Sequence, residues 1–403
     1  MSPGSWTADD PSSHNAPGPL TEPIVACKRD RRSVACHRQR RPETGGVADW
    51  RRIGILRLDN AGDVVLAGPV MRSLRSRFPD AGLTLVASTG GAAAAPLLPW
   101  VDDVLVWDAL WQDANGRLPF EPGRELEAID RLRRRRLDVA IILTSFSQTP
   151  FAAAYACYLA GIPVRVGHAD AFGGAVLSHP IAGPAPTHQA DRNLHLLRGL
   201  GVAVDDEDLG IDVPCDSRAA AAGWLAESGI CEGEPVVVVP GASCASRRAA
   251  PSLLGRALAD VRRRTDRPVV VVGTAAEAAL ADPIRAAVPG ALDLTGRTSL
   301  PQMAAVVAAA GVVVTNNSLA MHLADALGRP VVVTFAGTDL EAEWAPRRAQ
   351  SVLLRNPTVC APCRLFECPV AGHPCLEIAP SAVADAVASL LGEPARTARR
   401  TVP

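Results

Sequence analysis

Apolar runs built around valine constrain the fold of this chain more than any other feature of its sequence. Five apolar segments recur in the second half: "PVVVVP" (235–240), "PVVVVG" (268–273), "GALDLTG" (290–296), "GVVVTNN" (311–317) and "PVVVTFAG" (330–337). A strand with one face in water alternates apolar and polar residues, whereas an uninterrupted apolar strand is typical of a parallel sheet covered by helices on both faces. The runs therefore predict an α/β fold.

A second series of the same kind occupies the first half of the chain. Val70, Leu74 and Phe78 recur at four-residue spacing, which is typical of a helix, and Pro69 and Pro79 suit its first turn and its end. Two series of alternating strands and helices predict two doubly wound domains with a cleft between them. The strands expected in the first half are 53–58, 83–88, 104–108, 138–144 and 164–168.

The length of the chain also favours two domains, because 403 residues exceed what one hydrophobic core usually holds. We expect a first domain over residues 51–213 and a second over 214–380, followed by a C-terminal helix and tail over 381–403. Residues 202–235 are acidic and then Ala-rich, which indicates a connection and one helix. Residues 1–50 are polar, charged and Pro-rich, so we expect a disordered extension.

Composition argues against two classes of partner. A net charge of −1 and an aromatic content of 4% do not favour nucleic-acid binding. No apolar run approaches the roughly 20 residues that span a bilayer, and the N-terminus has no apolar signal segment. We expect a cytoplasmic protein with at most a peripheral membrane contact. The basic run "RLRRRR" (131–136) is better explained as a solvated helix face than as a membrane contact.

Asp63 stands where the first predicted strand passes into a helix, in "ILRLDNAGDVVLAGPVMRSL" (55–74). Negative charge is favourable at a helix N-terminus, so Asp63 has one explanation as a cap. The other explanation is a base that points into a cleft, because ligands of such sheets bind beyond the carboxyl ends of the strands.

Two loops that follow strands of the second half have the composition of phosphate sites. "PGASCASRR" (240–248) offers a glycine turn, hydroxyl groups and paired arginines, and "TNNS" (315–318) precedes a helix that Asn317 or Ser318 could cap. The alternatives are a surface loop with solvated arginines and, for His322 in that helix, a structural histidine. Neither loop has a dinucleotide-binding or P-loop motif, which argues against a dehydrogenase or an NTPase.

Four of the ten cysteines cluster in "CAPCRLFECPVAGHPC" (360–375). They are Cys360, Cys363, Cys368 and Cys375, and four thiols at this spacing could hold a structural metal. The alternative is a compact reduced loop in which the thiols only pack. The other six cysteines are scattered along the chain, and we interpret them as ordinary small residues.

Together these segments resemble glycosyltransferase family 9, the ADP-heptose:lipopolysaccharide heptosyltransferases. The N-terminal segment is similar to the family's opening GD signature, and "VVVVPGASCASRR" is similar to its PGAS-type loop. "DLTGRTSLPQMAAVVAAAGVVVTNNSLAMHLADALGRPVVVTFAGT" resembles the family's longest motif. The resemblance covers about residues 53–391 and implies a GT-B fold, in which two Rossmann-like domains face each other across an interdomain cleft.

The resemblance also implies roles for individual residues. Asp63 matches the general base of an inverting transfer that needs no catalytic metal or other cofactor, with Arg57, Asn60 and Gly62 on the acceptor side. The nucleotide-sugar donor, an ADP-sugar above all, would be bound by Gly241, Ser243, Arg247, Thr295, Gly296, Asn317, Ser318 and His322. The acceptor would be a cell-envelope glycan or glycolipid.

The sequence departs from the family at three positions. Asn317 replaces an aspartate, Leu319 a glycine, and Ala249 a tryptophan that commonly follows the lysine at the position of Arg247. Two other functions therefore remain open. One is a nucleotide-sugar epimerase on the same scaffold, and the other is a catalytically silent GT-B-like binding protein.

Overall fold

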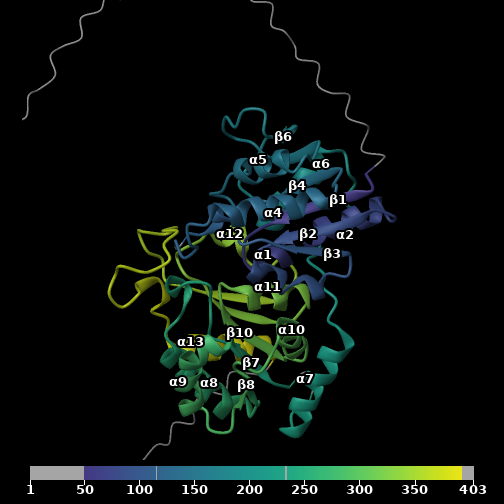
Figure 1. The fold of residues 1–403 in the computed structure, drawn as a ribbon. Coiled ribbons are helices and arrows are strands. Elements are labelled where there is room, and N and C mark those ends of the chain that lie inside the picture. The colour runs from purple at the N-terminus through teal and green to yellow at the C-terminus, as the bar shows by residue number, and fades with distance from the viewer. Residues whose placement is uncertain (1–49, 115, 232–233, 393–403) are drawn as a thin grey trace, which may run out of the picture. The chain divides into compact units, whose positions relative to one another are not determined.

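The computed structural model describes residues 50–114, 116–231 and 234–392, and they form two parallel sheets of six strands each (Figure 1). The expected extension over residues 1–49 and the tail over 393–403 lie outside the described residues. Trp50 was expected to belong to the disordered extension, but it is buried. Its ring packs on the ring of Phe78, with 5.5 Å between the centroids. The folded part of the chain therefore includes Trp50.

The first sheet has the strand order β3-β2-β1-β4-β5-β6. Each of the five expected strands of this half is present, within one or two residues of its expected ends. The short strand β6 contains Pro180 and gives no apolar run, so the sequence did not reveal it. The strands are β1 (Arg52–Arg57), β2 (Gly82–Ala87), β3 (Asp103–Val106), β4 (Val139–Ile142), β5 (Val164–His168) and β6 (His179–Ile181).

The second sheet has the order β12-β11-β10-β7-β8-β9, which is the topology of the first sheet repeated. Four valines of β7 are fully buried and pair with β10 and β8, which explains why this strand tolerates no polar residue. The sequence did not predict β12, a half-buried edge strand. The strands are β7 (Val236–Val239), β8 (Val269–Val271), β9 (Leu292–Asp293), β10 (Val312–Asn316), β11 (Val331–Thr334) and β12 (Ser351–Leu354).

Helices connect the strands of the first sheet. In α2, Pro69 occupies the first turn and the helix ends before Pro79, as expected. The basic run lies at the end of α4, where Arg133 and Arg134 are exposed, and this confirms the solvated face. The helices of this half are α1 (Ala61–Val65), α2 (Gly68–Arg77), α3 (Thr89–Ala92), α4 (Pro122–Arg134), α5 (Phe151–Leu159) and α6 (Gln189–Gly199).

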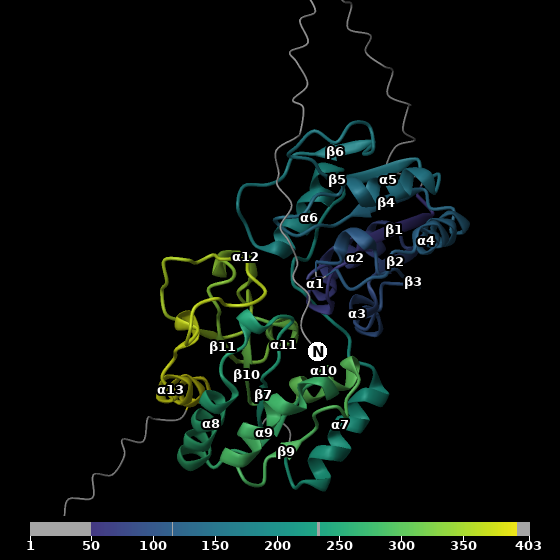
Figure 2. The same cartoon turned by 60° about the vertical axis from the view of Figure 1, so that its left-hand side comes forward.

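The connection between the sheets contains α7, and α13 near the C-terminal end packs on α8 (Figure 2). Within the described ranges no helix is long and apolar enough to cross a membrane. The helices of this half are α7 (Cys215–Glu227), α8 (Pro251–Thr265), α9 (Ala278–Ala287), α10 (Leu300–Ala308), α11 (Leu319–Ala326), α12 (Glu341–Trp344) and α13 (Pro380–Leu390), and short 3-10 turns cover 95–97, 110–112, 245–247, 275–277 and 374–376.

Candidate active site

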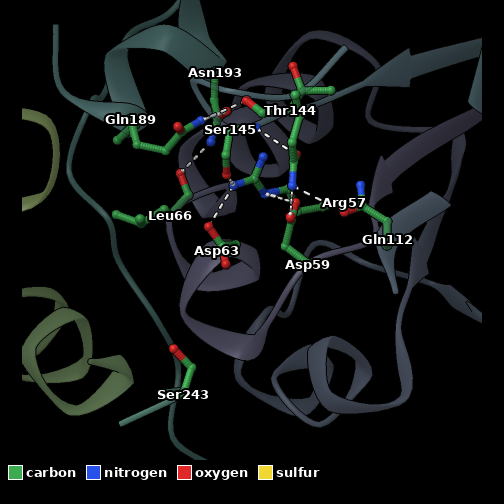
Figure 3. Close-up of polar contacts among 12 residues, drawn as sticks. Arg57, Asp59, Asp63, Leu66, Gln112, Thr144, Ser145, Gln189, Asn193 and Ser243 are labelled. Carbon is green, nitrogen blue, oxygen red and sulfur yellow. Dashed lines mark hydrogen bonds and ion pairs between the residues drawn. The ribbon is translucent and has the colours of Figure 1, made fainter. Parts of the chain in front are cut away.

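The carboxylate of Asp63 lies just beyond the carboxyl end of β1 and is held by Arg57 (Figure 3). Its Oδ1 accepts a hydrogen bond of 2.6 Å from Nη2 of Arg57, and no described residue bonds to its second oxygen. Asp63 sits in the first turn of α1, but its side chain does not cap that helix, and neither does Asn60 at the N-cap position. Asp63 is therefore not a side-chain cap, although its charge lies in the first turn of α1, where negative charge is favourable.

Arg57 is fully buried and sits between two carboxylates. Its Nε lies 3.3 Å from Oδ2 of Asp59, and its Nη2 also donates to Oγ of Ser145 at 2.8 Å. Burial raises the pKa of Asp59, and the charge of Arg57 opposes that rise. Arg57 therefore orients Asp63 from the buried side. Its expected place on the acceptor side stays a prediction.

Gly62 lets α1 approach α11 of the second half closely. A Cβ atom at Gly62 would lie 3.1 Å from Cδ2 of His322 and 3.6 Å from Cα of Leu319. Its neighbour Asn60 is exposed, and the carbonyl of Asn60 accepts the backbone N–H groups of Asp63 and Val64. The close approach places the helix that carries Asp63 directly against the helix that carries His322.

His322 is buried in this contact. Its pKa is lowered to about 4, mainly by burial and also by the charges of His188 and Arg247, while Asp63 and Asp325 oppose the change. The imidazole is therefore neutral at pH 7 and can accept or donate one hydrogen bond.

The start of α11 differs from the expected capping. Ser318 is at the N-cap position, but its hydroxyl pairs with Oγ1 of Thr315 at 3.1 Å, and the amide of Asn317 donates to Oδ2 of Asp339 at 3.1 Å. Neither side chain caps the helix, because Ser318 bonds to Thr315 in β10 and Asn317 bonds to Asp339 in the loop after β11. The first-turn N–H groups of α11 thus carry no side-chain cap.

Arg247 is paired with an acidic residue that the sequence did not reveal. Its Nη2 lies 2.9 Å from Oδ2 of Asp339, and its Nη1 donates to Oγ of Ser243 at 3.3 Å. Asp339 is almost fully buried and also accepts the hydroxyl of Thr338 at 2.6 Å. The position of Asp339 directly after β11 was the available signal, since loops that follow parallel strands carry the site.

Asn316 holds the two candidate phosphate loops together. Its Oδ1 accepts the N–H of Ala249 at 2.9 Å, and its Nδ2 donates to the carbonyl of Pro240 at 2.7 Å. The buried side chain therefore fixes the loop after β7 against the end of β10. The sequence indicated both loops, but not that one amide joins them.

Gly241, Thr295 and Gly296, three further expected donor residues, lie in the loops after β7 and β9. A Cβ atom at Gly241 would lie 1.8 Å from Oε1 of Glu277, so only glycine leaves room for this carboxylate. Gly296 has a φ of +71° and donates its N–H to the carbonyl of Gly273. The hydroxyl of Thr295 is buried without a hydrogen-bond partner among the described residues. Glu277 is a further residue that sequence reasoning missed.

The sequence model of glycosyltransferase family 9 (heptosyltransferase) matches residues 126–373, which is more than half of the chain. The chain belongs to glycosyltransferase family 9. It is thus a glycosyltransferase of the heptosyltransferase family, as we predicted from the sequence. No curated protein sequence matches it.

Solved structures share the fold of this family 9 chain. A family 9 glycosyl transferase from Veillonella parvula has a TM-score of 0.69 at 19% identity and covers 85% of this chain and 98% of its own. E. coli ADP-heptose lps heptosyltransferase II has a TM-score of 0.64 at 21% identity, with 84% and 98% covered. E. coli heptosyltransferase WaaC, solved with ADP, has a TM-score of 0.60 at 17% identity, with 84% and 97% covered. These matches confirm the expected GT-B architecture.

The cysteine segment of the family 9 chain docks on the loop after β11. The N–H of Cys363 donates to the carbonyl of Gly337, and the N–H of Arg364 donates to that of Thr338. Burial raises the pKa of the Cys375 thiol, the backbone hydrogen bond with Gly337 opposes the rise, and the other three cysteines of the segment add to it. Within the described part of the chain, no three His, Cys, Asp or Glu residues form a group that could hold a metal, and the expected metal gains no support.

The docked cysteine segment brings a second arginine to the site. Nη2 of Arg364 donates to both carboxylate oxygens of the buried Glu343, at 2.8 and 2.7 Å, and Nη1 of Arg364 lies 3.5 Å from Oδ1 of Asp339. Asp339 and Glu343 are therefore each paired with an arginine. Of the scattered cysteines, Cys157 and Cys244 are buried as small core residues.

Proposed function

We propose that this chain is an inverting glycosyltransferase that moves a heptose or related sugar from an ADP-sugar to a hydroxyl of a cell-envelope glycan. The observation that carries the proposal is the Asp63 carboxylate. It is oriented by a buried guanidinium, retains one oxygen without a hydrogen bond, and lies on a helix packed against the helix of His322. An aspartate without this support would not be held in a fixed direction.

The proposed step is a single displacement at the anomeric carbon. Asp63 takes the proton of the acceptor hydroxyl as that oxygen bonds to the anomeric carbon. The bond from this carbon to the diphosphate oxygen breaks, and its electron pair leaves with ADP. Attack from the face opposite the leaving group inverts the configuration, and no metal takes part in the step. General-base assistance of this kind contributes about 10²- to 10⁴-fold in rate.

We assign the donor to the loops that follow β7, β9 and β10. Arg247 would exchange its partner Asp339 for a phosphate, and the N–H groups at the start of α11 would face the developing negative charge. Asp339 then keeps Asn317 and Thr338 as partners. The other donor contacts proposed are Gly241, Ser243, Thr295, Gly296, Ser318 and His322.

Two structures of one E. coli relative support an ADP-sugar as the donor. Heptosyltransferase WaaC was solved with ADP and with ADP-2-deoxy-2-fluoro heptose. In this chain Asn317 occupies the position where the family has an aspartate, and its amide is used internally by Asp339. The Asn317 side chain is therefore proposed to fix Asp339 rather than to contact the sugar.

We also propose that the enzyme works in the cytoplasm and touches the membrane at its periphery. Large apolar side chains of the first half are exposed, among them Phe120, Phe172, Tyr155 and Tyr158. Exposed apolar residues of this size favour contact with an apolar partner, and a lipid-linked acceptor would provide one.

A donor screen tests the proposal. The chain is incubated with ADP-, GDP-, UDP- or dTDP-sugars and cell-envelope extract, and products are identified by mass spectrometry. We expect glycan modification with the ADP-sugar and none in the Asp63→Asn variant. An acceptor-free NMR time course that showed conversion of the donor would instead identify an epimerase. Isothermal titration without any ADP binding would remove the donor assignment.

A further inference from the structure

We propose that Arg192 binds an anionic group of the acceptor, a carboxylate or a phosphate, beside the Asp63 base. Arg192 belongs to α6, outside the segments in which the sequence motifs lie. The inference deepens the proposed function and rests on it in one respect: the ligand is taken to be the acceptor.

The position of α6 places Arg192 at the catalytic edge of the first sheet. Nδ2 of Asn193 donates to the carbonyl of Leu66, and Nε2 of Gln189 donates to the carbonyl of Thr144 (Figure 3). These two bonds fix α6 against the end of α1 and the loop after β4. The guanidinium carbon of Arg192 lies 5.4 Å from the centroid of Phe146, and Phe146 directly follows Ser145, which accepts a hydrogen bond from Arg57.

Arg192 is a buried cation without an internal partner. The residue is only 7% exposed, and its guanidinium makes no hydrogen bond or ion pair within the described ranges. Its Nε is completely buried and has no hydrogen-bond partner. Its two terminal nitrogens keep some exposed surface. Buried charges are normally paired, because removal from water is costly. Two terminal N–H groups with residual access and no partner are therefore available to a ligand.

The surroundings of Arg192 suit a sugar that carries a negative charge. Its guanidinium carbon lies 5.4 Å from the centroid of Phe146, and the Phe146 ring meets Trp344 edge-on at 6.1 Å. His168 ends β5, and its Nε2 lies 3.3 Å from Nδ1 of His195, one turn after Arg192 on α6. The pKa of His168 is lowered to about 3, first by burial and then by the charge of Arg192, so this imidazole is neutral and does not compensate the charge of Arg192.

An oxyanion is the ligand class that this chemistry selects. A guanidinium forms two parallel hydrogen bonds with a carboxylate or a phosphate, and the bond is strong where water is excluded. Asp170 is the carboxylate whose charge raises the pKa of Arg192. It accepts the N–H of Gly183, and among the described residues it forms no ion pair with Arg192. An anionic acceptor would complete the missing pair and place its hydroxyl beside Asp63.

The test uses the full chain and two probes, inorganic phosphate and galacturonate. Thermal unfolding is recorded for the unmodified chain, for Arg192→Met and for the control Arg198→Gln, each with saturating ADP to occupy the donor loops. Arg198 lies on the same helix, is exposed and pairs with Glu207. We expect at least one probe to raise Tm in the unmodified chain and in the control, and the rise to be lost in Arg192→Met.

The outcomes separate this inference from the proposed function. A Tm rise with phosphate alone indicates a phosphorylated acceptor, and a rise with galacturonate alone indicates an acidic sugar. An equal rise in Arg192→Met, or no rise with either probe, overturns the inference. If ADP itself raises Tm in no variant, the donor assignment fails, while the difference between Arg192→Met and the unmodified chain still tests Arg192.

Without probe, Arg192→Met should unfold at the same or a higher temperature, since it removes an unpaired buried charge. A large fall would also overturn the inference.

Discussion

At the scale of single residues, the site depends on one buried guanidinium. Arg57 serves Asp59, Asp63 and Ser145 at once, so its position is determined by three partners from three segments. The sequence placed Asp63 correctly at the end of the first strand, but a spacing of six residues did not reveal that Arg57 would hold it.

Asp63→Asn should abolish most of the transfer activity and keep the fold. The amide can still accept the hydrogen bond from Arg57, but it cannot take a proton, so we expect kcat to fall by about 10²- to 10⁴-fold. ADP affinity, measured by isothermal titration, should be unchanged because the donor loops are untouched. Retention of full activity would show that another group is the base.

His322 makes stability depend on pH in a defined window. Its pKa is about 4 in the folded chain and near 6.5 in the unfolded chain, so the unfolded chain binds the proton first as the pH falls. Stability from this residue is complete above pH 6.5 and is lost between about pH 6.5 and 4, by on the order of 3 kcal/mol.

Urea unfolding of the chain and of His322→Gln from pH 8 to 4 measures this contribution. We expect a shallower loss of unfolding free energy in the variant. Part of the slope should remain in both, because His168 has a lowered pKa as well. Parallel curves for the two proteins would contradict the assignment.

At the scale of elements, close approaches between loops and helices decide which groups meet. Gly62 admits the side chain of His322, and Gly241 admits the carboxylate of Glu277. Gly241 lies where the sequence predicted a glycine turn, so a preference for turn conformations explained it equally well, and Gly62 lies inside α1. What each glycine makes room for comes from another element of the chain, and only the packing identifies it.

Gly241→Ala should destabilise the chain and weaken ADP binding. The new methyl group would collide with Glu277, which would have to leave its capping box with Thr274. The loss of that cap costs about 1 kcal/mol in unfolding free energy.

Gly223→Ala is the matched control for this change. Gly223 lies in α7, and a Cβ atom there would meet nothing within 4 Å. An alanine in a helix interior should stabilise by about 0.5–1 kcal/mol. Equal effects of the two substitutions in urea unfolding would contradict the packing argument.

At the scale of the whole molecule, the two halves share one sheet topology and are joined by contacts that the sequence does not predict. Arg347, after α12, has its Nη2 2.8 Å from Oδ1 of Asp191 on α6. The same arginine donates to the carbonyl of Glu207 in the connection. Because these residues are far apart in the sequence and carry no motif, they appear only once both halves are folded.

A double-mutant cycle of Arg347→Met and Asp191→Asn should show coupling between the halves. The side chain of Arg347 is 19% exposed, so screening is partial, and we expect a coupling of about 0.5–3 kcal/mol in urea unfolding. The cycle of Arg348→Met and Asp208→Asn is the control. The side chain of Arg348 is 65% exposed, and its coupling should be roughly 0–1 kcal/mol. Similar values for both pairs would contradict the distinction.

The sequence by itself determined the secondary structure, the family and the edge of the sheets at which chemistry occurs. Valine runs such as that of β7 are specific because a strand buried on both faces tolerates no polar residue. Asp63, Arg247 and Asn317 were found because loops after parallel strands lie at one edge. β6 and β12 were missed because short edge strands need no continuous apolar pattern.

Only the tertiary structure decided the partners of these groups. Asp63 with Arg57, Arg247 with Asp339 and the unpaired Arg192 depend on which atoms burial brings together, and local spacing does not encode that. A charge that is removed from water must find a partner or remain without one, and the outcome depends on the whole fold. For Arg192 the outcome is a cation without an internal counterion.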